Sequence, residues 1–373
     1  MKNFLLTCSF LFLISISIFP QEPDVICPVV QVDKSAEYAQ VGGIFKPSQN
    51  APGEFLRVLI VFAEFEDDTN EYTTWDYGEL PFYANSILDA SPSSTYTPFT
   101  LSDYWKTMSM GNFDIIGDIY PEVIRINSEA YYRTNGKYFQ DCNLEVLNRI
   151  DDGTIDFRQY DNWRFNSATG AFESNEGDGD RILDMMYIIY RNPINDNLWF
   201  TTTWYDDFTA IAILGDDMDY TTMDNIKIGG HYIGHNASGI TVRQGASYSS
   251  YPDFMTKVLS HELGHYLFGS DHTTFGGIMG NNSAGHTGTL SGYERERLGY
   301  VSYTVAYQNN FTTVLGDYVT EGDVLQIPIP STNDYFLVEN HQRLNRYDQI
   351  ARGGPIQGLL IQIPHMGKEF MYG

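Results

Sequence analysis

The sequence has few cysteines for a chain of its length. Three occur in 373 residues, and Cys8 lies within the apolar N-terminal segment. The remaining two, Cys27 and Cys142, permit one disulfide in an oxidising compartment, and two unpaired thiols are an equally good interpretation. Their spacing alone does not decide between these alternatives.

Basic residues are also scarce. The chain has 22 Lys and Arg against 48 Asp and Glu, which gives a formal net charge of -26. Such a chain repels phosphate backbones, so we expect no nucleic-acid partner. The acidic excess favours solubility outside the cell, and an alternative is that some carboxylates hold calcium.

Long apolar runs are limited to the N-terminus. Lys2 precedes an apolar stretch from Phe4 to Phe19, and Pro20 ends it. The stretch is too short for a stable membrane span and polar chain follows at once, so residues 1–20 are predicted to be a secretory signal peptide. No later segment is apolar enough to span a bilayer. We therefore expect a secreted, extracellular protein with no integral membrane segment after signal cleavage.

The rest of the chain has enough apolar material for a substantial core, with 42% hydrophobic and 15% aromatic residues. Residues 21–44 are predicted to be an irregular N-terminal lead-in, 45–300 the main folded domain, and 301–373 a β-rich C-terminal part of the same unit. The sequence ends soon after an apolar strand, which is typical of a truncated chain.

The apolar patterns predict an α+β fold. Strands are expected at 55–68 and 183–191, a helix at 141–151, and only strands beyond residue 300. Ser102 is a candidate N-cap for a further short helix, and Gly111 a candidate stop.

The most informative window is "VLSHELGHYLFGSDHTTFGGIMG", residues 258–280. It lies at the end of a predicted helix with Asp253 as N-cap and Gly269 as C-terminal stop. His261 and His265 are four residues apart, so both imidazoles project from one face of the helix, as two corners of a zinc tetrahedron require.

Two neighbours of these histidines have candidate roles of their own. Glu262 is rotated by about 100° around the helix, so it lies beside the metal and can take a proton from a water molecule on the metal. Gly264 leaves room for a substrate or a neighbouring strand. The alternative is a pair of structural histidines with a solvated glutamate.

The third zinc ligand is ambiguous. The pattern H-E-x-x-H-x-x-G-x-x-H places its last histidine at position 271, but the sequence has Asp271 there and His272 one residue later. Zinc accepts oxygen as well as nitrogen ligands, and adjacent residues on an extended segment point in opposite directions. We favour His272 because the shifted Gly-x-x-His spacing is intact; His286 and Glu294 are further candidates.

Three downstream residues have weaker functional interpretations. Met279, in the glycine-flanked stretch "GGIMG", is positioned to form an apolar floor under a metal, although a lone methionine usually only fills a core. Tyr293 and His286 are candidates to stabilise an oxyanion. For Tyr293 a structural role is the simpler interpretation, because tyrosine is abundant in this chain.

A second candidate metal site is the acidic stretch "NEGDGDRILD", residues 175–184. Glu176, Asp178, Asp180 and Asp184 fall at positions 1, 3, 5 and 9 of a calcium loop. Position 6 is Arg181 instead of glycine, and the terminal glutamate is absent. The alternative is an acidic turn that leads into a strand; calcium here would be structural.

Several segments in order resemble one family, the immune-inhibitor-A-like secreted zinc metallopeptidases of bacteria. They include "RVLIVFAEFEDD", "LSDYWKTMSMGNFDIIGDIY", "EGDGDRILDMMYIIYR", "HELGH", "GGIMG", "LSGYERERLGYV", "YFLVENHQ" and "GLLIQIP", between about residues 43 and 363. Many members have an acidic residue near position 271, where this chain offers both Asp271 and His272.

The resemblance implies bacterial export and a zincin-like fold, with a mixed sheet, an active-site helix and a methionine turn. It also implies that His261 and His265 bind zinc and that Glu262 is the general base.

Two classes of function follow from these patterns. The first is a secreted zinc endopeptidase that cleaves protein or peptide substrates, with Glu262 as the catalytic residue and His261, His265 and His272 as metal ligands. The second is a non-catalytic surface or matrix module with a structural or decayed metal site. A glycoside hydrolase is suggested only by the number of carboxylates, and no spacing supports it.

Overall fold

The structure is a computed structural model of the chain. It describes residues 55–69, 75–166, 171–174, 179–191, 210–215, 218–229, 239–244, 258–268, 277–280, 288–307, 311–349, 358–364 and 368–372. Several residues of interest lie outside this part: the predicted signal peptide and lead-in, Cys27, Glu176, Asp178, Asp253, Gly269, Asp271, His272 and His286.

The described part is an α+β fold, as predicted, and its larger sheet is mixed. The strands are β1 (Phe55–Phe65), β2 (Asp114–Ile119), β3 (Ile124–Ile126), β6 (Met186–Arg191), β7 (Ala210–Ile211) and β10 (Gly239–Gln244). Their order is β2-β1-β6-β10-β7, with β3 also paired to β1. All pairings are parallel except that of β7 with β10, which is antiparallel.

The central strands are covered on both faces. Alternate residues of β1 point to opposite sides, so Val58 and Phe62 enter one core cluster whereas Val61 and Phe65 enter the other. The first cluster includes α1 (Leu101–Met108) and α4 (Ser260–Phe268), and the second includes α3 (Phe139–Ile150). This double coverage explains why β1 and β6 are continuous apolar runs in the sequence.

The helix predicted at 141–151 is confirmed as α3, but the predicted start of α1 is wrong. Thr100 is the N-cap, because its side chain accepts a hydrogen bond from the Asp103 N–H. Ser102 lies inside the helix, where its hydroxyl accepts a hydrogen bond from the Asp89 N–H. Both hydroxyls suit an N-cap, and only the path of the preceding chain distinguishes them.

The region beyond residue 300 forms a second sheet in the order β11-β12-β13-β14-β15. Its strands are β11 (Thr304–Val305), β12 (Val324–Pro328), β13 (Tyr335–His341), β14 (Gly358–Ile363) and β15 (Lys368–Tyr372). The expectation of strands alone was wrong at two places in the described residues, since Tyr318–Glu321 forms the one-turn helix α6 and Arg346–Gln349 a 3-10 helix. Asp317 caps α6 by accepting the Thr320 N–H.

The remaining elements are short. Two helices are α2 (Glu129–Thr134) and α5 (Gly292–Arg297), and two hairpins pair β4 (Trp163–Asn166) with β5 (Ala171–Ser174) and β8 (Asp219–Thr221) with β9 (Lys227–Gly229). Short 3-10 helices occupy Ala84–Ser86, Phe157–Tyr160 and Arg346–Gln349. Among the described residues, no helix has both the length and the apolar character needed to cross a membrane.

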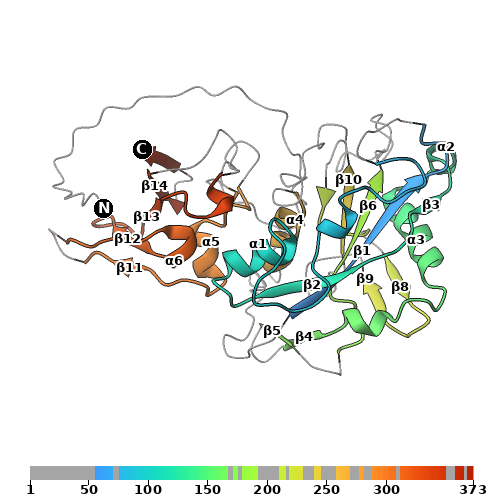
Figure 1. Cartoon of the computed structure of the whole chain (residues 1–373), viewed down its shortest axis with the longest axis horizontal. Helices are drawn as coiled ribbons and strands as arrows, with labels where there is room; N and C mark the ends of the chain where they lie inside the picture. Colours follow the sequence, from blue (N-terminus) through green and yellow to red (C-terminus); the bar gives the residue numbers. More distant parts are fainter. Residues whose placement is uncertain are drawn as a thin grey trace.

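The two larger sheets share one core through the helices between them. Figure 1 shows α1, α4 and α5 between the six-stranded sheet and the C-terminal sheet. Val324 and Leu337 of the second sheet belong to the same buried cluster as Leu263 of α4 and Val58 of β1. The C-terminal strands and α4 therefore belong to one continuous core.

A buried charged network lies in the C-terminal sheet. His341 is hydrogen-bonded through Nδ1 to Asp348 at 2.8 Å and through Nε2 to Glu339 at 3.1 Å. Burial lowers the pKa of His341, but the bonds to the two carboxylates outweigh it and raise the pKa to about 9. Glu339 also accepts the Gly292 N–H at 2.7 Å, which joins this network to the first residue of α5.

This network predicts a specific dependence of stability on pH. The pKa of His341 rises on folding from its ordinary value of about 6.5 to about 9. The contribution of protonated His341 to the free energy of unfolding is therefore complete below about pH 6.5 and is lost as the pH rises through 9. The free-energy difference in urea unfolding between the wild type and His341→Gln should fall by roughly 3 kcal/mol over that interval. A difference independent of pH would contradict the assignment.

Candidate metal centre

Helix α4 forms because one of its faces is apolar and packs against the six-stranded sheet. Leu259, just before the helix, and Leu263 and Leu267 within it are four residues apart and fully buried. Tyr187 of β6 donates its hydroxyl to the Leu259 carbonyl at 2.9 Å. Burial, and then the nearby carboxylate of Glu262, keep the pKa of Tyr187 well above its ordinary value, so this phenol stays a donor.

The two histidines of α4 lie side by side, as their spacing predicts. Their ring centroids are 5.0 Å apart and the ring planes are nearly perpendicular, at 86°. Both side chains are largely buried, with 7% of His261 and 4% of His265 exposed. Two imidazoles this close, on one side of a helix, can bind a single metal ion.

The orientation of His261 is set by a backbone carbonyl. Its Nδ1 lies 2.5 Å from the carbonyl oxygen of Ile278, which can only accept a hydrogen bond. The proton of the neutral ring must therefore be on Nδ1, and Nε2 keeps the lone pair that a metal needs. Histidine ligands of metal sites are commonly held in this way.

The space beside the backbone of Gly264 is filled by Met279 of the turn 277–280. A Cβ atom added at Gly264 would overlap the Met279 sulfur, so the side chain of Met279 packs directly against the helix backbone. Met279 is fully buried in the same core cluster as α4. Glycine is required here by this close contact.

Glu294 of α5 holds the same turn from the other side. Its carboxylate accepts the N–H groups of Ile278 at 3.1 Å and Met279 at 2.8 Å, and also that of Ser291 at 2.7 Å. Burial raises the pKa of Glu294 to about 7, although these three N–H groups act in the opposite direction. Glu294 thus holds the turn in place, and both of its carboxylate oxygens accept hydrogen bonds from backbone N–H groups.

The glutamate of the motif is completely buried. Glu262 is 0% exposed, next to His261 in the sequence and rotated from it around the helix. Burying a carboxylate costs free energy of folding unless cations or hydrogen-bond donors surround it. The Glu262 carboxylate lies near the Tyr187 phenol, whose pKa it helps to raise.

The described residues do not supply a third metal ligand beside His261 and His265. Within the described ranges, no group of three or more His, Cys, Asp or Glu side chains is arranged to hold a metal ion. Asp271, His272 and His286 all lie outside those ranges. The described structure therefore supplies two of the expected ligands.

Two of the four calcium candidates are described, and both make local contacts. The Asp184 carboxylate accepts the N–H groups of Asn162 at 2.7 Å and Trp163 at 2.9 Å, and Asp180 accepts the Ile182 N–H at 3.0 Å. Burial raises the pKa of Asp184 well above its ordinary value. These bonds fold the turn that precedes β6.

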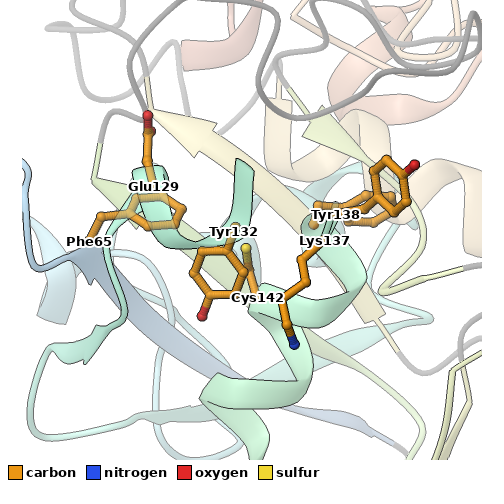
Figure 2. A pocket seen from close by; sticks show the side chains of 7 residues that line it. Phe65, Glu129, Tyr132, Lys137, Tyr138 and Cys142 are labelled. Carbon is orange, nitrogen blue, oxygen red and sulfur yellow. The ribbon is translucent and has the colours of Figure 1, made fainter. Parts of the chain in front are cut away.

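The remaining candidates have structural surroundings. Tyr293 is a half-buried residue of α5, and the Arg297 guanidinium lies over its ring at 5.7 Å. Cys142 is a free, buried thiol on the opposite face of the six-stranded sheet from α4. It borders the small pocket of Figure 2, and burial keeps its pKa well above the ordinary value, so it stays protonated.

Comparison with known proteins adds no independent assignment. The sequence matches neither a model of a known protein family nor a curated protein. Any functional assignment therefore depends on the residues and geometry described above.

Two contributors to this site were missed by sequence reasoning. The Ile278 carbonyl is backbone, so no residue type marks it. Glu294 was considered as a metal ligand, whereas it holds the turn. The capping-box spacing of Ser291 and Glu294 could have indicated a helix start, but nothing local indicates that the same carboxylate reaches residues 278 and 279.

The packing of Gly264 makes a prediction with a definite sign. Helix propensity alone would stabilise Gly264→Ala by about 1 kcal/mol. The overlap with Met279 should instead make the variant less stable by about 1–3 kcal/mol in urea unfolding. The Met279→Ala substitution removes the overlapping side chain. In that background, adding Gly264→Ala should therefore cost less stability than it does in the wild type. A Gly264→Ala variant more stable than the wild type would show that the helix and the turn are not in contact.

Proposed function

We propose that this chain is a secreted zinc-dependent endopeptidase. The observation that carries the proposal is the pair of adjacent imidazoles on α4, with His261 held through Nδ1 by the Ile278 carbonyl. Glu262, buried on the same helix and next to His261 in the sequence, is the proposed general base. Protein or peptide chains are the proposed substrates.

The residues present fit a zinc ion. His261 and His265 offer two nitrogen donors on one face of a helix, and the tautomer of His261 leaves Nε2 to bind. We propose His272 as the third ligand, with Asp271 as the alternative. A fourth position occupied by water would make the site catalytic.

When bound, zinc would polarise the scissile carbonyl and make a water molecule more acidic. Glu262 would accept a proton from the attacking water and later deliver it to the leaving amine. Its complete burial keeps that proton away from bulk solvent between the two transfers. The Ile278 carbonyl would hold His261 in one orientation during the cycle.

The surroundings of α4 support the same proposal. A mixed sheet lies behind the helix, and a methionine-containing turn packs against Gly264. Together with the resemblance to immune-inhibitor-A-like metallopeptidases, this supports a zincin-like catalytic fold. Structural calcium near Asp178, Asp180 and Asp184 is a further proposal.

The second candidate function is a non-catalytic secreted module with a closed structural zinc site. The burial of both imidazoles favours it, because a structural site needs no opening for substrate. In such a site all four ligands come from the protein and Glu262 has no chemical role. The two candidates therefore differ in what a change at Glu262 does.

Replacement of Glu262 by glutamine tests the catalytic role. Glu262→Gln keeps the size of the side chain but removes the base, so bound zinc should stay near the wild-type level while casein or gelatin cleavage falls by at least about 100-fold. Glu296→Gln, at an exposed position on α5, is the matched control and should keep full activity. Full activity in Glu262→Gln would rule out this mechanism.

Single substitutions at the two adjacent candidates identify the third ligand. His272→Ala should lose most of the bound zinc, measured by metal analysis of the purified protein, whereas Asp271→Ala should keep it. The reverse pattern would assign the ligand to Asp271. If both variants keep full zinc content, the third ligand lies elsewhere in the chain.

A further inference from the structure

A single peptide group joins His261 to Glu294. The carbonyl oxygen of Ile278 is 2.5 Å from His261 Nδ1, and the N–H of Met279 donates to Glu294 Oε1 at 2.8 Å. These C=O and N–H groups belong to the same planar amide and point in opposite directions. The imidazole and the carboxylate therefore lie on opposite sides of one rigid group.

In such an arrangement the charge of the Glu294 carboxylate affects the imidazole of His261 through the amide between them. A carboxylate that accepts a hydrogen bond from an amide N–H polarises the amide and makes its oxygen a better acceptor. A better acceptor at Ile278 holds the ring proton of His261 more firmly on Nδ1 and makes Nε2 a better ligand. Carboxylates commonly do this for metal-bound histidines by direct contact, whereas here an amide lies between the two groups.

We propose that Glu294 is a positioning residue of the metal centre. It acts through the Ile278–Met279 peptide to fix the tautomer and orientation of His261, and in this way it raises the affinity of the site for zinc. The role assigned to the metal rests on the proposed function, whereas the effect on His261 belongs to the metal-free protein as well.

The sequence around the turn is arranged for this contact. A Cβ atom at Gly277 would overlap the carboxylate of Glu294, and Gly277 has a φ of +124°, which other residues rarely adopt. Glycine at 277 therefore allows the carboxylate to reach the N–H groups of both Ile278 and Met279. Without that close approach, the amide would not be polarised.

Helix α5 is fixed by contacts that do not involve Glu294. Arg295 is completely buried and donates to the carbonyls of Tyr318 at 2.9 Å and Val319 at 3.3 Å. The Gly292 N–H donates to Glu339. These contacts should keep α5 in place when Glu294 is changed, so the effect on the turn can be measured separately.

The test compares Glu294→Gln with Glu339→Gln. Both remove one buried carboxylate that binds the start of α5, but only the first touches the turn. Zinc affinity, measured by competition with a chelator, should fall about 10- to 100-fold in Glu294→Gln and by less than about threefold in Glu339→Gln. Nitrogen-15 NMR of the histidines in the metal-free proteins should show less of the Nδ1–H tautomer of His261 in the first variant only.

Unchanged zinc affinity and an unchanged tautomer in Glu294→Gln would overturn the inference, and so would equal losses in both variants. If wild-type protein binds no zinc, the proposed function fails, and the NMR comparison alone decides the role of Glu294. Should Glu294→Gln not fold, Glu294→Asp, which shortens the reach by one methylene, is compared with Glu339→Asp under the same criteria.

Discussion

The contact between α4 and the turn 277–280 is the constraint on which the candidate site depends. It has two parts, a hydrogen bond from His261 to the Ile278 carbonyl and the packing of Met279 against Gly264. The first part sets which nitrogen of His261 can bind a metal. The second fixes the distance between the turn and the helix backbone, because no Cβ atom fits between them.

This contact is supported from both sides by the rest of the fold. On one side, Tyr187 of the central strand β6 holds the residue that precedes α4, and the apolar face of the helix packs into the sheet. On the other side, Glu294 holds the turn, and α5 is joined through Gly292 to the buried Glu339–His341–Asp348 network. The C-terminal sheet is thus connected to the site by short, buried hydrogen bonds.

Local patterns predicted the parts of this fold that depend on local physics. The apolar runs predicted β1 and β6, the 3.6-residue spacing predicted α3, and the spacing of His261 and His265 predicted two adjacent rings. Contacts between distant segments were not accessible in the same way. Glu294 reaches a turn about 15 residues earlier, and the neighbour of Gly264 is a methionine that could equally have filled another part of the core. The N-cap of α1 was misplaced for a similar reason, because Thr100 and Ser102 are chemically equivalent and only the chain path selects one.

The proposed function requires that the imidazoles of His261 and His265 bind one zinc ion and that a water molecule completes its coordination. An X-ray absorption spectrum at the zinc edge of the zinc-loaded protein tests it most directly. If zinc binds as proposed, the spectrum shows at least two imidazole nitrogens at about 2.0–2.1 Å and an oxygen ligand that exchanges with solvent. A spectrum with four protein ligands and no exchangeable oxygen, or without imidazole scattering, would contradict it.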